Sequence, residues 1–273
     1  MNKKLNNRRE FLKNAAGISA LAPVVVRAQT AASRERVTGS NDVIGMGVIG
    51  LGGNGMGHVR ELQRLEGVRV VAVCDVYQKR LESGVNLTGA KGYQNHEELL
   101  DDPMVDAVVI STPDHRHSEI SIDAMRAGKD VDVEKPMSLT IDEARQMVEV
   151  SKKTGRILAV DSEHTAHGIW KPARAAVKNG VLGKLLWSQT SRSRNSQQPP
   201  WNYQLEEEAN PATVNWDRWQ GETASRPFDR ERFFRWRKYW EYSGGIATDL
   251  YVHHLTPLMK VTGPEFPMRA VSA

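Results

Sequence analysis

Apolar runs of strand length alternate with segments of helical periodicity in the first part of the chain. The strand-length runs cover residues 43–49, 68–74, 106–110, 129–133 and 157–160. The helical segments cover residues 77–88, 114–127 and 141–154. Runs that are apolar almost throughout are typical of strands covered on both faces, and their alternation with helices indicates a parallel sheet. The sequence therefore predicts an α/β fold, with a Rossmann-type, doubly wound parallel sheet over residues 43–162.

The second part, residues 163–273, has a weaker pattern. Helices are predicted at residues 169–179 and 246–261, strands at residues 184–192 and from near Met268, and irregular chain at residues 195–230. Two strands rarely make a stable sheet. We therefore expect an incomplete α+β domain with an open antiparallel sheet and helices, and we expect the chain to be a fragment of a longer protein.

A glycine loop follows the first predicted strand and opens a helix. It has the spacing G-x-G-x-x-G at Gly50, Gly52 and Gly55. Gly50 allows the tight turn, Gly52 lets a diphosphate approach the backbone, and Gly55 lets helix and strand pack closely. A flexible turn would have the same composition. The strand before the loop and the helix after it favour a dinucleotide site, because N–H groups at the helix start face the anion.

Asp75 stands at the end of the second predicted strand. A carboxylate in that place accepts hydrogen bonds from the adenosine ribose and repels a 2′-phosphate, which favours NAD. Lys79 and Arg80 follow closely and are able to accept that phosphate, so the sequence also allows NADP. The alternative role for Asp75 is that of a helix cap.

Ligands of such sheets bind outside the carboxyl ends of the strands, and three polar segments are predicted to meet there. They are residues 111–117, with Thr112, Pro113 and His117; Glu134 with Lys135 and Pro136; and residues 161–164. We expect the binding cleft at these segments.

Asp249 and His253 lie four residues apart in the last predicted helix, so both side chains are expected on one face. A carboxylate placed in this way orients an imidazole and raises its basicity, as general-base catalysis requires. An ordinary helix-surface pair or a buried histidine is the alternative, and it is the commoner outcome for an isolated D-x-x-x-H. Lys135 upstream and the glycines just before this helix favour the catalytic interpretation.

Together these motifs resemble the Gfo/Idh/MocA oxidoreductases, and more narrowly the exported members with twin-arginine leaders. The resemblance rests on the glycine loop, T-P-x-H-x-H from Thr112, A-G-K-D-V-D-V-E-K-P from Ala127, and the helix with Asp249 and His253. It implies NAD(P)-dependent hydride transfer with a sugar or polyol-like substrate. It also implies a catalytic group at Lys135, Asp249 and His253, and a homo-oligomer formed through the sheet of the second part.

The expected cofactor is NAD, with NADP allowed. The residues expected to contact it are Gly50, Gly52, Gly53, Asn54, Gly55, Asp75, Thr112, Pro113, His117, Glu134 and Lys135. Two other functions stay open: an NAD-using glycosidase or lyase that oxidises the sugar transiently, and a nucleotide-binding fragment without activity. Lys135 favours simple oxidoreduction, because the glycosidase branch of the family departs from E-K-P.

The first 28 residues are typical of a twin-arginine export signal. Residues 8–13 read R-R-E-F-L-K, an apolar stretch follows at residues 15–26, and small residues before Gln29 suit a signal peptidase. A chance arginine pair in an irregular N-terminus is the alternative. Residues 29–42 are polar and are predicted to be a linker. We expect export to the periplasm, with the twin-arginine machinery as a partner.

Charge and composition restrict the remaining functions. The leader holds six basic residues and one acidic residue, so the rest of the chain is nearly neutral although the whole chain is at +4. That balance gives no reason to expect nucleic acid as a partner. The apolar stretch of the leader is too short for a stable membrane span. His115, His117, His164 and His167 fit no zinc template, so no metal site is predicted.

Overall fold

The structure, a computed structural model, describes residues 43–193, 195–197 and 199–263. The predicted leader and linker, and the strand expected from near Met268, lie outside the described residues. Within those residues, none of the helices combines the length and the apolar character that a membrane span requires.

The first part contains a six-stranded, wholly parallel sheet with the strand order β3-β2-β1-β4-β5-β6. The strands are β1 (Ile44–Ile49), β2 (Val68–Cys74), β3 (Lys91–Tyr93), β4 (Ala107–Ile110), β5 (Asp130–Glu134) and β6 (Leu158–Asp161). The order reverses between β1 and β4, which is the topology of a doubly wound dinucleotide-binding fold. The predicted fold class of the first part is confirmed.

Helices cover both faces of this sheet, which explains why its central strands are apolar throughout. α3 (Gly53–Leu62) and α4 (Gln78–Thr88) pack on one face, and α5 (His96–Asp101), α6 (His117–Arg126) and α7 (Ile141–Thr154) pack on the other. On the first face Val59 meets Val48, and on the second Met147 joins Ile110 in the core. All six residues of β1 and all four of β4 are buried as a result.

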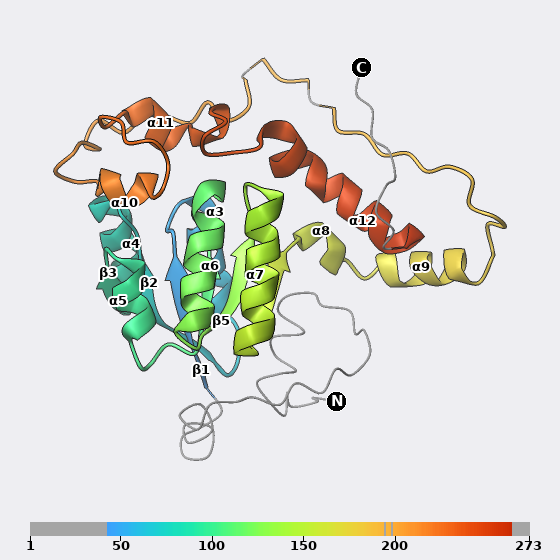
Figure 1. Ribbon diagram of the computed structural model, residues 1–273, viewed down its shortest axis with the longest axis horizontal. Helices are drawn as coiled ribbons and strands as arrows, with labels where there is room; N and C mark the ends of the chain where they lie inside the picture. Colours follow the sequence, from blue (N-terminus) through green and yellow to red (C-terminus); the bar gives the residue numbers. More distant parts are fainter. Residues whose placement is uncertain (1–42, 194, 198, 264–273) are drawn as a thin grey trace.

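The second part is built from short helices joined by long irregular segments. Its elements are α8 (Glu163–Ala166), α9 (Trp170–Lys178), α10 (Trp216–Gln220), α11 (Arg230–Phe234), the 3-10 turn η2 (Trp236–Lys238), the π-helix η3 (Ala247–Tyr251) and α12 (Val252–Thr262). Figure 1 shows α10 and α11 above the end of the sheet that contains β2 and β3, whereas α12 lies against α8 and α9.

A buried aromatic layer joins the two parts. Tyr77, the third residue after β2, is fully buried and packs edge-on against Phe233 and Phe234, with ring centroids 5.8 and 6.3 Å away. Tyr77 also forms an antiparallel bridge with Val214. The second part is therefore seated on the carboxyl end of β2, above the edge where a doubly wound sheet binds its ligand.

The strand predicted at residues 184–192 is wrong. This segment has no regular secondary structure and pairs with no strand among the described residues, and Leu186 and Trp187 keep 84% and 75% of their surface exposed. An apolar run forms a strand only where a neighbouring strand accepts its hydrogen bonds and a core covers one face. Neither is present among the described residues, so the expected antiparallel sheet is not formed in them. The sequence prediction also missed β3, α5, α10 and α11.

The glycine turn between β1 and α3 is closely packed. Gly50 has φ = +89°, a conformation that favours glycine, and a Cβ there would lie 2.6 Å from the carbonyl oxygen of Ser111. A Cβ on Gly55, in α3, would lie 1.8 Å from the carbonyl oxygen of Gly50. Gly55 therefore has the packing role predicted for it, because any side chain would push α3 away from the turn.

Replacing Gly55 with alanine should lower the free energy of unfolding by about 1–3 kcal/mol, the usual cost of forcing extra volume into a packed interior. Gly57 is the matched control, because it lies in the same helix and nothing is within 4 Å of its ideal Cβ position. Gly57→Ala should raise that free energy by about 0.5–1 kcal/mol through helix propensity. Urea unfolding of the nucleotide-free protein measures both, and equal effects of the two substitutions would contradict the packing role.

Candidate functional site

The glycine loop forms the floor of a cavity of about 360 Å³ at the carboxyl end of the sheet. Gly52 and Gly53 leave open space above the backbone, because the nearest atom to an ideal Cβ on Gly52 is the guanidinium of Arg80 at 3.9 Å and none lies near Gly53. The first turn of α3 begins at Gly53 and directs its free N–H groups outward. This geometry suits the diphosphate of a dinucleotide.

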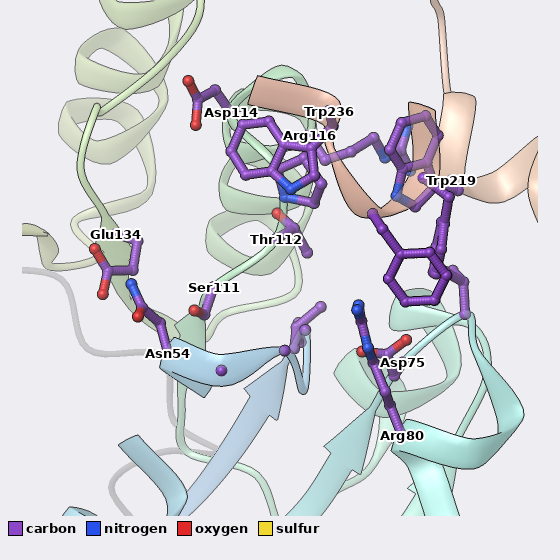
Figure 2. A pocket seen from close by; sticks show the side chains of 18 of the residues that line it. Asn54, Asp75, Arg80, Ser111, Thr112, Asp114, Arg116, Glu134, Trp219 and Trp236 are labelled. Atoms are coloured by element: carbon purple, nitrogen blue, oxygen red, sulfur yellow. The ribbon is translucent and has the colours of Figure 1, made fainter. Parts of the chain in front are cut away.

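The structure brings most of the predicted contact residues to this one cavity. Those that line it are Gly50, Gly52, Gly53, Asn54, Asp75, Thr112, Pro113, Glu134 and Lys135. Gly55 and His117 are not among the lining residues. Figure 2 shows Asp75 and Arg80 on one side of the cavity, and Asn54 and Glu134 on the other. A dinucleotide with its ribose near Asp75 would therefore extend toward Glu134 and Lys135.

Asp75 is buried and holds the loops around it in place. Its Oδ2 accepts a hydrogen bond from the N–H of Leu51 at 2.7 Å, and its Oδ1 accepts one from the N–H of Tyr77 at 2.8 Å. Burial raises the pKa of Asp75, although Arg80 and these two hydrogen bonds oppose the rise. Each carboxylate oxygen has a second lone pair, so Asp75 is still able to accept a ribose hydroxyl.

His117 and Glu134 connect the polar loops to each other. The ring nitrogens of His117 lie 2.7 Å from the carbonyl oxygen of Pro136 and 2.9 Å from that of Thr112, so this buried histidine bridges two loops instead of lining the cavity. Glu134 is 2.8 Å from Nε2 of His58, on α3. Burial acts to raise the pKa of Glu134, but His58 and Lys135 outweigh it and hold that pKa below its usual range.

At the Glu134 end of the cavity, Lys135 forms a buried ion pair with Asp249 of the π-helix η3. Its Nζ donates to Oδ1 of Asp249 at 2.9 Å and to the carbonyl oxygen of the same residue at 2.7 Å. The carboxylate also accepts from Nε of Arg237 and from Nε1 of Trp201, each at 3.1 Å. Burial acts to raise the pKa of Asp249, but Arg237 and Lys135 together hold it below its usual range.

His253 takes a different place from the one its spacing indicated. Among the described residues, the Asp249 carboxylate accepts its hydrogen bonds from Lys135, Arg237 and Trp201. The cause is η3, in which hydrogen bonds run from residue i to i+5, so residues four apart no longer stack as they do in an α-helix. The His253 ring packs on that of His164 instead, with centroids 4.6 Å apart. A catalytic role for His253 stays a prediction.

Sequence reasoning missed one buried acid in this cavity. Asp114 follows the T-P dipeptide after β4, lines the cavity and is only 2% exposed. Burial raises its pKa, and Asp249 adds to the rise against the opposing effects of His117 and Arg237. The sequence signal was present, because Asp114 lies within the polar segment expected at the carboxyl edge. No pattern distinguished it from an ordinary turn residue.

Two groups of side chains have the composition of metal ligands. In each group the ligand atoms lie within 4.8 Å of one another. The first group is His58, Glu134 and Asp161, and the second is His96, Glu119 and Asp123.

The histidines considered from sequence are not in these two groups. Burial lowers the pKa of His115 to about 3, and its Nε2 faces the carbonyl oxygen of Trp219 at 2.8 Å, so this ring is neutral and structural.

Comparison with known proteins identifies this arrangement. Residues 44–162 match the family model for oxidoreductases with an NAD-binding Rossmann fold, and residues 167–267 match the model for the C-terminal alpha/beta domain of the same family. The chain belongs to the Gfo/Idh/MocA oxidoreductase family. Its sheet and glycine loop are accordingly the NAD-binding domain of that family.

Curated relatives in the family differ in their reported activities. The chain is 35% identical to a myo-inositol 2-dehydrogenase of Thermotoga maritima over 159 residues, which is 58% of this chain and 47% of that protein. It is 30% identical to an alpha-N-acetylgalactosaminidase of Shewanella oneidensis over 204 residues, which is 66% of this chain and 44% of that protein. The chain thus spans less than half the length of these relatives.

Solved structures give the same fold. An example is a putative NADPH-dependent oxidoreductase of Desulfitobacterium hafniense, which is 23% identical, covers 53% of this chain and 42% of its own, and superposes with a TM-score of 0.50. At this identity the likeness concerns the fold alone.

Asp249→Asn should lower the free energy of unfolding at neutral pH by about 3–5 kcal/mol, because it leaves the largely buried Lys135 and the partly buried Arg237 without their counter-ion. The control is Asp142→Asn. Asp142 pairs with Arg145 at the surface, where both side chains are mostly exposed, so we expect a change within about 0.5 kcal/mol.

The difference between wild type and Asp249→Asn should also depend on pH. The pKa of Asp249 is depressed in the folded state, so its stabilisation is complete above the ordinary pKa of an aspartate and is lost as the pH falls through the folded value. Urea unfolding across the acidic range measures this. A difference that stays constant down to the lowest pH would show that the charge of Asp249 is not the stabilising feature.

Proposed function

We propose that this protein is an NAD-dependent oxidoreductase that transfers a hydride between the nicotinamide and a ring polyol or sugar. The observation that carries the proposal is the position of Lys135, a buried ammonium group at the far end of the cavity whose floor is the glycine loop. Family membership and the myo-inositol 2-dehydrogenase among the relatives support a polyol as the substrate class.

The residues of the cavity fit a bound dinucleotide. The open glycine loop receives the diphosphate, Asp75 faces the ribose position, and the buried hydroxyl of Thr112 has no hydrogen-bond partner in the described part of the chain. When bound, NAD supplies the acceptor or donor of the hydride. NAD in place of NADP is favoured by Asp75, because its carboxylate repels a 2′-phosphate.

Lys135 is arranged to hold the reacting oxygen. An ammonium group has three N–H donors, and in the described residues Asp249 accepts two of them. The third is left to donate to a substrate hydroxyl or carbonyl oxygen, which orients the carbon that exchanges the hydride and stabilises negative charge on the oxygen. Asp249 holds the side chain of Lys135 in place, and His253 stays the proposed general base, as a role independent of Asp249.

A second candidate function is favoured by one observation. Several relatives at 30–32% identity carry the name glycosyl hydrolase family 109 protein, and they match 66% of this chain. An NAD-using glycosidase would release the substituent of an aryl glycoside without a net change in NAD. An oxidoreductase would form NADH from a polyol and leave the aryl glycoside intact, so one incubation with each substrate discriminates the two functions.

Export is also proposed. The R-R-E-F-L-K segment supports a twin-arginine signal, and that pathway carries folded proteins, so the cofactor would be loaded before the protein leaves the cytoplasm. We further propose that the protein forms a homo-oligomer, as the family resemblance implies.

Lys135→Met should lower kcat/KM for polyol oxidation by about 10²–10³-fold, the usual effect of removing one donor that stabilises negative charge on the reacting oxygen, and leave NAD binding intact. NADH absorbance and NAD titration measure the two effects. Lys153→Met is the control, because the Lys153 side chain is 77% exposed and remote from the cavity. Turnover by Lys135→Met within a few-fold of wild type would refute the assigned role.

Replacing Arg8 and Arg9 together with lysine should stop export and leave the unprocessed protein in the cytoplasm, because the pathway recognises the arginine pair. Cell fractionation of a Gram-negative host and the mass of the N-terminus measure the outcome. Arg27→Lys keeps the same net charge outside the motif and should be exported normally. Periplasmic protein in the double variant would contradict the proposed signal.

A further inference from the structure

Two buried carboxyl groups, those of Asp249 and Asp114, lie at the Lys135 end of the cavity. They differ in their hydrogen-bond partners. Asp249 was expected from sequence to serve the reaction, and both of its carboxylate oxygens accept hydrogen bonds, Oδ1 from Lys135 and Arg237 and Oδ2 from Trp201. Asp114 was not singled out. Its Oδ2 is buried and has no hydrogen-bond partner in the described residues.

Asp114 is placed by the fold, since it is the first residue of the 3-10 turn η1 (Asp114–Arg116), which follows β4 and leads into α6. Ser243, from the segment before η3, forms a hydrogen bond with its carboxyl group, and the titratable groups that face it are His117, Arg237 and Asp249. Asp114 thus lies where the Rossmann domain meets the second part.

None of these neighbours is left to satisfy Oδ2. Arg237 donates from Nε to Asp249, both ring nitrogens of His117 face main-chain carbonyl oxygens, and among the described residues no other donor, the remaining guanidinium N–H groups of Arg237 included, forms a hydrogen bond with Oδ2. A buried acceptor without a donor is costly and rare in native proteins, and such groups are found where a ligand or catalytic partner supplies the missing hydrogen bond. Thr112, on the same turn, has a buried hydroxyl in the same condition.

The position of Asp114 indicates which ligand supplies the donor. Figure 2 shows Asp114 on the Glu134 side of the cavity, opposite Asp75 and Arg80. That is the end where Lys135 lies, beyond the expected position of the adenosine. A carboxylate with a free oxygen accepts a hydrogen bond from a neutral hydroxyl and repels phosphate, so the structure points to a hydroxyl of the substrate.

We propose that Asp114 is a substrate-binding residue that accepts a hydrogen bond from a hydroxyl of the polyol, next to the hydroxyl held by Lys135. This inference rests on the proposed function and deepens it, because it requires a substrate with at least two hydroxyls. Oδ2 is covered in the structure, and the carboxyl group turns about its last torsion to meet the ligand, a broad and shallow rotation for aspartate.

The test uses the NAD-loaded chain with myo-inositol as the probe and compares Asp114→Asn with Asp75→Asn. Asparagine keeps the shape of the side chain and removes the charged acceptor. Asp114→Asn should raise the KM for myo-inositol and its Kd by about 10–100-fold, the usual effect of losing a hydrogen bond to a charged group, and leave the Kd for NAD unchanged. Asp75→Asn should have the opposite pattern: it should raise the Kd for NAD and have little effect on the Kd for myo-inositol. Fluorescence of Trp219 and Trp236, which line the cavity, reports binding without turnover.

Cyclohexanepentols, each lacking one hydroxyl of myo-inositol, identify the hydrogen bond itself. One of them should bind wild type more weakly than myo-inositol does, yet bind Asp114→Asn about as well as myo-inositol does, because the contact is already lost in that variant. A substitution that acted only through the fold would weaken all of the compounds alike.

The free energy of unfolding provides a test that needs no ligand. Asp114→Asn should be about as stable as wild type at neutral pH, because it removes a buried charge that lacks a donor at Oδ2 and places a neutral amide group in the same space. A less stable variant with unchanged KM would assign Asp114 a structural role and overturn the inference. Wild-type affinity for myo-inositol in Asp114→Asn would also overturn it and leave the proposed function standing. A wild-type chain that loads NAD but neither binds nor oxidises myo-inositol would refute both.

Discussion

The buried ion pair between Lys135 and Asp249 is the interaction on which the site depends. Neither charge is stable away from water without the other, and each belongs to a different part of the chain. The Rossmann domain alone would leave Lys135 exposed at the end of β5, where solvent would screen it. The pair therefore requires the segment around η3 to cover the sheet, and Arg237 and Trp201 complete the enclosure.

The aromatic layer supplies the attraction that the ion pair lacks. Salt bridges of this kind contribute little net stability, because removing the charges from water offsets their attraction. Burial of Tyr77, Phe233 and Trp219 has no such offset, and it fixes the second part above β2. The layer and the ion pair lie at opposite ends of one cavity. Apolar packing therefore holds the second part against the adenosine end, and the charge pairing sets the geometry at the reacting end.

The sequence predicted what depends on local pattern and missed what depends on distant partners. β1, β2 and α7 could be predicted because an apolar run or an amphipathic repeat is sufficient to specify each. The run at residues 184–192 has the same local character, but a strand needs a neighbour, and none of the described residues provides one. α10 and α11 were missed because each is a five-residue turn stabilised by the aromatic layer and by a capping side chain, with no periodicity to detect.

The same limit applies to the functional residues. Asp75, Asp114 and Asp249 are all buried acids at the carboxyl edge of one sheet, and sequence spacing cannot rank them. Their environments distinguish them. Asp75 accepts hydrogen bonds from two backbone N–H groups, Asp249 neutralises two cations, and Asp114 has an acceptor oxygen without a donor among the described residues. An acid already committed to structural partners anchors a site, whereas one whose environment disfavours its charge and leaves an oxygen free is poised to act on a ligand. In this cavity Asp249, whose catalytic role stays a prediction, also pairs with two cations, whereas the carboxyl oxygen without a donor belongs to Asp114, which motif spacing had not singled out.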